Sequence, residues 1–405
     1  MNYRILIFSF LSFALSIPPL VASTEGLSQE AYFKSTDIGS DYLGNAVAVS
    51  GRFAIVSAVL EDGSGTGVNP PHDDLAVNSG AAYVYERIDG VWTFHSCLKA
   101  SNTDAGDSFG ADIAIDGDLL AISAVGESSN ATGINGDQAN NDAMSSGAVY
   151  LFRLEGDTWV QEAYLKASNS DTNDDFGTAL ALDGETLVVG APGDEGSHTE
   201  TGSAYVFVRS AGVWTEQARL NAIDYRNRDE FGSSVAIDGD TLVVGAPRED
   251  GSAIGVNGEK NNDANNSGAA YVFTRSGGIW SEIAYLKASN TDAEDGFGGA
   301  VSISGNTIAV GAVNERGSVG GINPVSNNDI LRTGAVYLFV DNGAGREPQA
   351  TIKAAVPTLN DEFGNKVELS GDLLVVAFHK ESGASAGLDG DQTTDGLAES
   401  GAGYL

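Results

Sequence analysis

Cysteine is almost absent from this 405-residue chain, in which Cys97 is the only one. A disulfide within the chain is therefore impossible, and stability must come from packing, with bound ions as a further contribution. The absence of a cysteine near the end of the N-terminal leader described below also argues against a lipid-anchored form.

Basic residues are scarce. Lys and Arg together number 21 against 56 Asp and Glu, which gives a formal net charge of −35. A chain this acidic repels nucleic acid and anionic lipid, so we expect neither as a partner. It attracts cations, divalent ones above all. A surface adapted to salty surroundings has the same composition, and the two interpretations are compatible.

Long apolar segments are lacking after the first residues, so no membrane insertion is expected. Residues 1–23 resemble a secretory signal, because Arg4 precedes the apolar stretch 5–16 and Val21-Ala22-Ser23 forms a small-residue cleavage site. The sequence therefore predicts a secreted, periplasmic or cell-surface protein with a cleavable signal peptide, followed by a single domain over residues 24–405.

Catalytic motifs are also lacking, and no enzyme is predicted. There is no Gly-x-Ser-x-Gly elbow, His-Glu-x-x-His helix or phosphate loop. His72, His95, His198 and His379 occupy unrelated positions in the repeats described next. Carboxylates abound, so counting alone leaves a glycosidase-type pair open. However, the acidic residues repeat sixfold, whereas a single active site should break the symmetry.

A long repeat is what the sequence does contain. A Phe-Gly pair, or Leu-Gly in the first copy, recurs with its glycine at positions 44, 110, 177, 232, 298 and 364. The spacing is 66 or 67 residues, except for one interval of 55. So regular a period is the mark of a repeat architecture.

Each period contains four strand-like runs. In the fourth period these are residues 233–237, 241–245, 269–274 and 281–288, called runs a to d. Runs a and b are joined by Asp238-Gly239, a strong hairpin signal. Run b is apolar at successive positions, as expected for a strand with both faces covered. Four antiparallel strands per unit predict an all-β fold, a β-propeller of four-stranded antiparallel blades.

The two ends of the chain suggest how the ring closes. The last period stops within run c, at Gly403-Tyr404-Leu405, whereas residues 29–35 resemble an isolated run d. We therefore expect six blades closed by an N-terminal strand, which leaves no free edge. The alternative is a seven-bladed propeller truncated at its C-terminus.

These motifs resemble FG-GAP repeats, the units of the integrin α-subunit propeller and of many secreted bacterial proteins. Gly190-Ala191-Pro192 and Gly245-Ala246-Pro247 match the second half of the motif best. The resemblance implies extracellular adhesion or ligand binding, and bound calcium. In integrins the calcium loop lies between runs a and b and resembles Asp-x-Asp-x-Asp-Gly. Here that link is a two-residue turn, so a metal site would have to lie elsewhere.

Acidic residues recur on the face expected to carry the b–c loops and the d–a links. They lie two residues before each Phe-Gly, two residues after each GAP-like triplet, and in the Asn-rich body of the longer b–c loops. The candidate metal ligands are Glu61, Asp107, Glu127, Asp142, Asp174, Asp194, Asp229, Glu249, Asp263, Asp295, Glu315, Asp329, Asp361 and Glu381.

Two interpretations of these acids remain open. Carboxylate, amide and backbone oxygens are the ligands that Ca²⁺ prefers, so each loop could hold one ion. Alternatively, Asp and Asn cap backbone amides in turns, or the Asp before Phe-Gly pairs with a Lys that recurs in run d. The Trp and Tyr residues of runs c and d likewise suit packing between strands better than a sugar-binding shelf.

We accordingly predict an adhesion or binding module that recognises an extracellular protein or polysaccharide through its acidic loops, with possible dependence on Ca²⁺. A secreted hydrolase or lyase acting on polysaccharide is one alternative. A purely structural module of a larger surface protein is the other.

Overall fold

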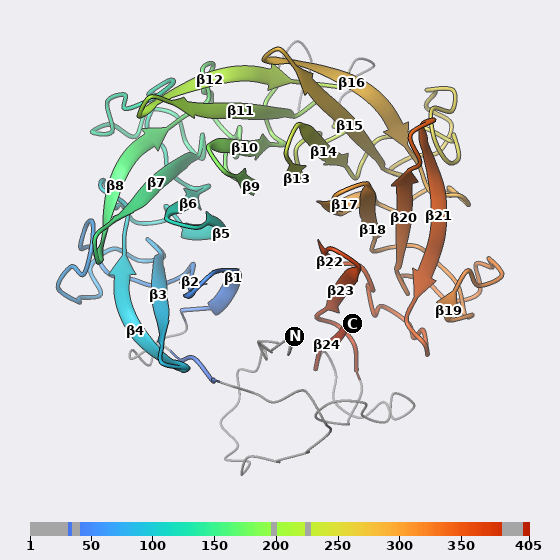
Figure 1. The fold of residues 1–405 in the computed structure, drawn as a ribbon, viewed down its shortest axis with the longest axis horizontal. Helices are drawn as coiled ribbons and strands as arrows, with labels where there is room; N and C mark the ends of the chain where they lie inside the picture. The colour runs from blue at the N-terminus through green and yellow to red at the C-terminus, as the bar shows by residue number, and fades with distance from the viewer. Residues whose placement is uncertain (1–30, 35–40, 196–200, 223–227, 383–399) are drawn as a thin grey trace.

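The computed structural model of this chain describes residues 31–34, 41–195, 201–222, 228–382 and 400–405. Its strands form six antiparallel sheets arranged around a common axis (Figure 1). The all-β propeller with six blades is therefore confirmed. The predicted signal sequence lies outside the described residues.

The first four blades repeat one meander in which each strand pairs with its neighbours in chain order. Their strands are β1 (Leu43–Ser50), β2 (Phe53–Ala58), β3 (Ala81–Ile88), β4 (Val91–Leu98), β5 (Phe109–Asp116), β6 (Leu119–Ala124), β7 (Ala148–Glu155), β8 (Thr158–Leu165), β9 (Ala179–Asp183), β10 (Thr186–Ala191), β11 (Ser203–Ser210), β12 (Val213–Leu220), β13 (Ser234–Asp238), β14 (Thr241–Ala246), β15 (Ala269–Ser276) and β16 (Ile279–Leu286). The first strand of each blade lies nearest the axis and the fourth lies outermost (Figure 1).

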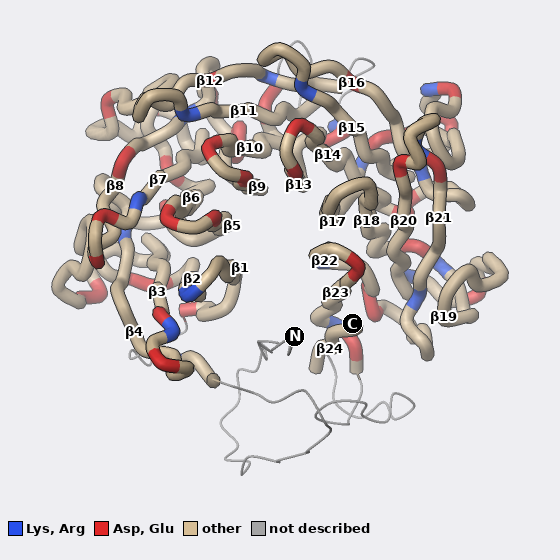
Figure 2. The backbone as a smooth tube through the Cα atoms, in the orientation of Figure 1, with Lys and Arg blue, Asp and Glu red and all other residues tan. Residues whose placement is uncertain are grey.

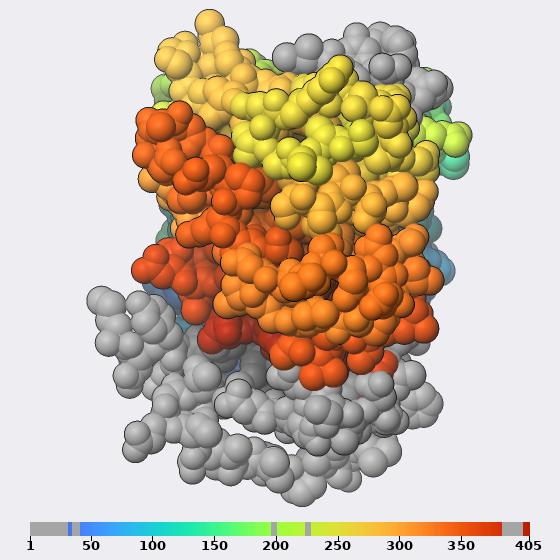
Figure 3. Space-filling view, turned by 90° about the vertical axis from the view of Figure 1, so that its right-hand side faces the viewer, coloured from blue at the N-terminus to red at the C-terminus, as the bar shows by residue number. Residues whose placement is uncertain are grey.

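The last two blades vary this scheme. Blade five consists of β17 (Phe297–Ser304), β18 (Thr307–Ala312), β20 (Ala335–Asp341) and β21 (Arg346–Lys353), with the short β19 (Gly321–Ile322) added outside β21. Within the described residues, blade six has β22 (Lys366–Ser370), β23 (Leu373–Phe378) and β24 (Ala402–Tyr404). In side view the surface of blades four to six forms successive bands from yellow to red (Figure 3).

The predicted closing strand, residues 29–35, is described only from Ala31 to Lys34, and these four residues belong to no strand. The Phe33 ring lies 4.2 Å from the Tyr85 ring and 6.0 Å from the Trp92 ring, centroid to centroid. This segment thus contacts blade one, next to which a closing strand would lie. Its pairing with blade six stays a prediction.

The second strand of each of the first five blades is buried on both faces, as its unbroken apolar sequence predicted. Every residue of β10 is buried, and so is every residue of β6. The core consists of layers between consecutive blades. For example, Phe176 and Leu187 of blade three pack in one layer with Leu151 of blade two.

The hairpin turns near the axis join neighbouring blades. The Asp116 carboxylate accepts a hydrogen bond from the Gly184 amide at 2.8 Å, and Asp183 accepts one from Gly239 at 2.6 Å. Each turn bonds to the turn of the next blade. Further links of this kind join Ser50 to Gly117, Asp238 to Gly305 and Ser304 to Gly371. Acidic positions accordingly appear at the β5 and β13 hairpins in Figure 2.

The Phe-Gly and Gly-Ala-Pro motifs meet between neighbouring blades. A Cβ added to Gly245 would lie 1.9 Å from the carbonyl oxygen of Gly298 in the next blade, and one on Gly190 would lie 1.9 Å from that of Gly232. Phe297 is fully buried beside them and contacts Tyr337 and Phe339 edge to face. These glycines are required because two backbones touch, as the sequence predicted for the Phe-Gly glycine.

Gly147→Ala should destabilise the protein strongly. Gly147 has φ +74°, and an added Cβ would lie 2.1 Å from the Phe176 carbonyl oxygen, so a rigid backbone group must move. We expect a loss of about 3 kcal/mol or more in unfolding free energy, measured by urea denaturation. Gly184→Ala is the control, since φ is +54° but nothing lies within 4 Å. It should lose only about 1 kcal/mol. Equal losses would contradict the close-contact argument.

Candidate functional site: the loop face

The b–c loops and the d–a links lie together at one end of the blades, and we call this surface the loop face. The two acidic stretches of each repeat meet there. The Gly126 amide donates to the Asp107 carbonyl oxygen at 3.0 Å, and the Arg248 amide donates to that of Asp229 at 3.3 Å. The stretches around Asp229 and Glu249 therefore project from the same side, as predicted.

The Asn- and Gly-rich body of the b–c loops pairs with the outermost strand of its own blade. The Asn135 amide donates to the Tyr164 carbonyl oxygen at 2.7 Å, and its side-chain Oδ1 accepts from the Tyr164 amide at 2.9 Å. Asn135 adopts φ 54°, a left-handed conformation that asparagine tolerates. Asn69, Asn257 and Asn323 repeat this arrangement. The asparagine of this motif thus fixes the loop through hydrogen bonds to backbone groups, as the structural interpretation of the loops predicted.

The Glu after each GAP-like triplet forms a buried ion pair in four blades. Lys166 Nζ donates to Glu127 Oε2 at 2.7 Å and to the Ser146 hydroxyl at 2.6 Å, and both charged side chains are almost completely buried. The corresponding pairs are Lys99 with Glu61 at 2.5 Å, Lys287 with Glu249 at 2.7 Å and Lys353 with Glu315 at 3.4 Å.

Burial lowers the pKa of Lys166, Lys287 and Lys353, while the paired glutamate opposes this shift. One of the two interpretations of the sequence paired this lysine with the Asp before Phe-Gly. In the structure its short contacts go to the glutamate instead.

Blade three replaces this pair by another one. Asp194 is in the place of the glutamate and Asn221 in the place of the lysine, and the cation comes from Arg219, two residues earlier. Arg219 Nη2 donates to Asp194 Oδ1 at 2.7 Å, and the Tyr205 hydroxyl donates to Asp194 Oδ2 at 2.5 Å. The role of Arg219 was not predicted from its position, although the loss of both Glu and Lys in the third repeat is a signal of a coupled exchange.

In four repeats the Asp before Phe-Gly caps the preceding turn. Asp107 Oδ2 accepts from the Asp104 amide at 2.7 Å, and Asp174, Asp295 and Asp361 accept from the amide three residues earlier in the same way. Burial raises the pKa of Asp107 to about 7; the Asp104 amide opposes this and the Glu127 carboxylate adds to it. Burial likewise raises the pKa of Asp174 to about 7 and that of Asp295 to about 8, with Asp194 and Glu315 as the neighbouring carboxylates that add to the rise.

Tyrosine and asparagine complete these clusters. The Tyr150 hydroxyl donates to Asn102 Oδ1 at 2.6 Å, and Asn102 Nδ2 donates to Glu127 Oε1 at 3.0 Å. Tyr205 with Asn169 and Tyr337 with Asn290 do the same. These tyrosines are buried, and so are Trp159, Trp214 and Trp280. The packing interpretation of the aromatic residues is confirmed for them.

The remaining candidates differ in exposure. Asp142, Asp263 and Asp329 are exposed in the b–c loops, and the backbone amide of each donates a hydrogen bond to the side-chain oxygen of the Asn two residues earlier. Asp229 and Asp361 are buried, and Glu381 is half-buried.

The oxygen atoms of the buried clusters suit the ammonium group of a lysine. In four blades the position beside the glutamate is taken by lysine, so a Ca²⁺ ion would have to displace a buried cation and then gather six to eight oxygens. The exposed Asp142, Asp263 and Asp329 offer carboxylates without such competition.

The structure therefore defines a β-propeller repeat protein whose loops are held by buried polar clusters. A family model described as the FG-GAP repeat matches residues 92–152, 159–207, 214–273 and 280–339, more than half of the chain. The chain belongs to the FG-GAP repeat family. Each match begins in the outermost strand of one blade and ends in the third strand of the next. No curated protein matches the chain.

Folds of this family are typically binding or structural modules and are commonly extracellular. Among the described residues, no helix has the length and apolarity needed to cross a bilayer.

Lys166→Met should remove a buried cation and leave the Glu127 charge uncompensated. We expect a loss of roughly 3–5 kcal/mol in unfolding free energy by urea denaturation, and a substantial recovery in the double variant with Glu127→Gln. Arg248→Met is the control, because the Arg248–Glu230 pair at 3.0 Å has an arginine side chain that is 53% exposed. It should change stability by less than about 1 kcal/mol. A loss from Lys166→Met no larger than the control's would contradict this account.

Asp107→Asn should make stability less dependent on pH. The raised pKa means that the folded state keeps the proton while the unfolded state loses it. The stabilisation is full below about pH 4 and is lost as pH rises to about 7. At pH 8 the unfolding free energy of the variant should exceed that of the wild type by up to about 4 kcal/mol, with near equality at pH 4. Chemical denaturation across this range measures the difference. The exposed Asp142→Asn is the control, and parallel curves for all three proteins would refute the assignment.

Proposed function

We propose that this protein is a secreted or cell-surface binding module that recognises an extracellular protein or polysaccharide through its loop face. The observation that carries the proposal is the combination of long, polar b–c loops with rigid anchors. Each described long loop is fixed to an outermost strand through its asparagine and sits beside a buried ion pair. Loops positioned by a rigid scaffold commonly carry binding sites.

Exposed apolar side chains on the loop face support a macromolecular partner. Leu75 is 80% exposed, Ile254 62% and Val325 81%, and each lies in a different b–c loop. Met144, Val77, Val319, Ile322 and Leu331 are further exposed members of these loops. Apolar groups within a polar rim are typical of interfaces. The acidic surroundings favour neutral or cationic partners.

The proposal includes Ca²⁺ ions that are bound jointly by the protein and its partner. In this proposal the exposed carboxylates of Asp142, Asp263 and Asp329 share a cation with oxygens of a bound polysaccharide. The buried glutamates are engaged by lysine. The dependence on Ca²⁺ is therefore expected for ligand binding rather than for folding.

No catalytic role is proposed. The recurring buried carboxylates accept hydrogen bonds from lysine, asparagine and backbone amides within their own clusters. Burial raises the pKa of the Cys97 thiol to about 12, so the thiol stays protonated and weakly nucleophilic at neutral pH.

Binding to immobilised chitin, chitosan, alginate and collagen tests the proposal, with Ca²⁺ or with a chelator. The variant carrying Leu75→Ser, Ile254→Ser and Val325→Ser should lose at least tenfold in affinity for the surface that binds the wild type. Val213→Ser, at an exposed position of a c–d hairpin on the opposite face, should bind normally. Equal loss in both variants, or no binding to any surface, would contradict the proposed loop-face module.

A further inference from the structure

The outermost strand of a blade contains a bulge that directs one side chain toward the next blade. In β4, Ser96 pairs with Val84 and Phe94 pairs with Tyr85, which leaves His95 without a partner residue in the ladder. The register shifts at the same place in β8, β12, β16 and β21. Such bulges re-aim side chains.

Two other bulge residues show what the position does. Glu162 accepts hydrogen bonds from Arg153 of its own blade and from Arg209 of the next. Gln217 accepts from the Trp280 indole of the following blade at 2.9 Å. In blades two and three the bulge residue therefore forms a polar contact across the blade junction.

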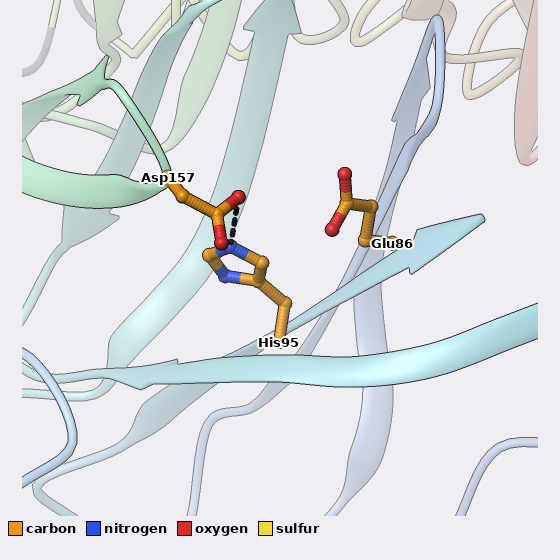
Figure 4. Close-up of side chains that lie close together, drawn as sticks. All are labelled: Glu86, His95 and Asp157. Atoms are coloured by element: carbon orange, nitrogen blue, oxygen red, sulfur yellow. Dashed lines mark ion pairs between the residues drawn. The ribbon is translucent and has the colours of Figure 1, made fainter. Parts of the chain in front are cut away.

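At the junction of blades one and two, this position brings a histidine together with two carboxylates. One potential ligand atom from each of Glu86, His95 and Asp157 lies within 4.8 Å of the other two. Glu86 comes from β3, His95 from β4, and Asp157 from the β7–β8 turn of blade two, and Figure 4 shows the three side chains converging. His95 Nε2 lies 3.7 Å from Asp157 Oδ1.

The second ring nitrogen is held by a neighbour. His95 Nδ1 lies 3.1 Å from the buried Ser96 hydroxyl, which orients the ring so that Nε2 faces the carboxylates. A hydrogen bond at one ring nitrogen is the usual support for a histidine that binds metal through the other. The His95 and Glu86 side chains are each 11% exposed, whereas that of Asp157 is 81% exposed. The cluster is thus buried on one side and open to solvent on the other.

We propose that Glu86, His95 and Asp157 form a site for a borderline divalent cation such as Zn²⁺, which staples blade one to blade two. Imidazole with carboxylates suits Zn²⁺ rather than Ca²⁺, which prefers oxygen alone. Tetrahedral zinc with ligand bonds of about 2.0–2.2 Å sets its donor atoms roughly 3.3 Å apart. The ligand atoms must therefore move closer together, and the exposed turn that carries Asp157 allows this. Water completes the coordination on the open side.

Arg52 competes with the ion. Its Nε donates to Glu86 Oε1 at 2.6 Å, and its side chain is 53% exposed over the Phe53 ring. Metal binding releases this arginine to solvent, so the site is expected to bind more tightly when Arg52 is removed.

Isothermal titration of the chelator-stripped protein with ZnCl₂, and with CaCl₂ in parallel, tests the site. The wild type should bind one Zn²⁺ and gain roughly 3 °C in Tm at saturating metal. His95→Gln should weaken this binding at least tenfold, and Arg52→Gln should strengthen it. His72→Gln, which alters an exposed loop histidine, is the matched control and should behave as the wild type.

The melting temperatures of all variants are compared first with chelator present, which separates metal binding from folding. If His95→Gln does not fold, Asp157→Asn at the exposed turn replaces it. Absence of Zn²⁺ binding by the wild type would overturn the proposal. Equal affinity of the wild type and the site variants would also overturn it, because the ion would then be held by the acidic surface in general.

Discussion

Close contact between backbones of neighbouring blades is the constraint on which the rest of this structure depends. Six sheets can surround one axis only if their inner strands nearly touch, and the glycines of the Phe-Gly and Gly-Ala-Pro motifs permit this. A Cβ on Gly245 or Gly311 would lie only 1.9 or 2.1 Å from a carbonyl oxygen of the next blade, far inside the contact distance of non-bonded atoms. The Gly-Ala-Pro motif of one repeat thus contacts the Phe-Gly motif of the next, and together they form the junction between two blades.

This packing forces polar groups into the interior, where they must satisfy one another. Strands that are buried on both faces end in loops whose first residues are buried too, so the carboxylates that follow β2, β6, β14 and β18 are taken out of water. An uncompensated buried charge is costly, and a lysine at the end of the outermost strand neutralises each one. Blade three shows that the constraint is charge balance rather than a fixed residue, because Asp194 and Arg219 replace Glu and Lys together.

Much of the fold could be predicted from the sequence because it depends on local signals. The Asp-Gly turns, the unbroken apolar run of Leu242-Val243-Val244 and the repeat period specify hairpins and blades without knowledge of distant contacts. The role of each acidic residue could not be predicted. Glu127 is separated from Lys166 by 39 residues, and nothing local distinguishes a carboxylate that binds a lysine from one that binds a metal. The hydrogen bond from Gly184 to Asp116 could not be predicted either, because the two residues are far apart in the sequence. The Asp-Gly turn alone was a sufficient explanation for the aspartate.

Internal lysines hold the glutamates of the loop face in four blades, which leaves the exposed loop residues for partners. A high-resolution crystal structure of the protein grown in millimolar Ca²⁺ tests this most directly. The account predicts that Lys287 Nζ remains within hydrogen-bond distance of Glu249 and that no ion lies between Asp229 and Glu249. A calcium ion bound to Glu249, with Lys287 displaced toward solvent, would contradict it.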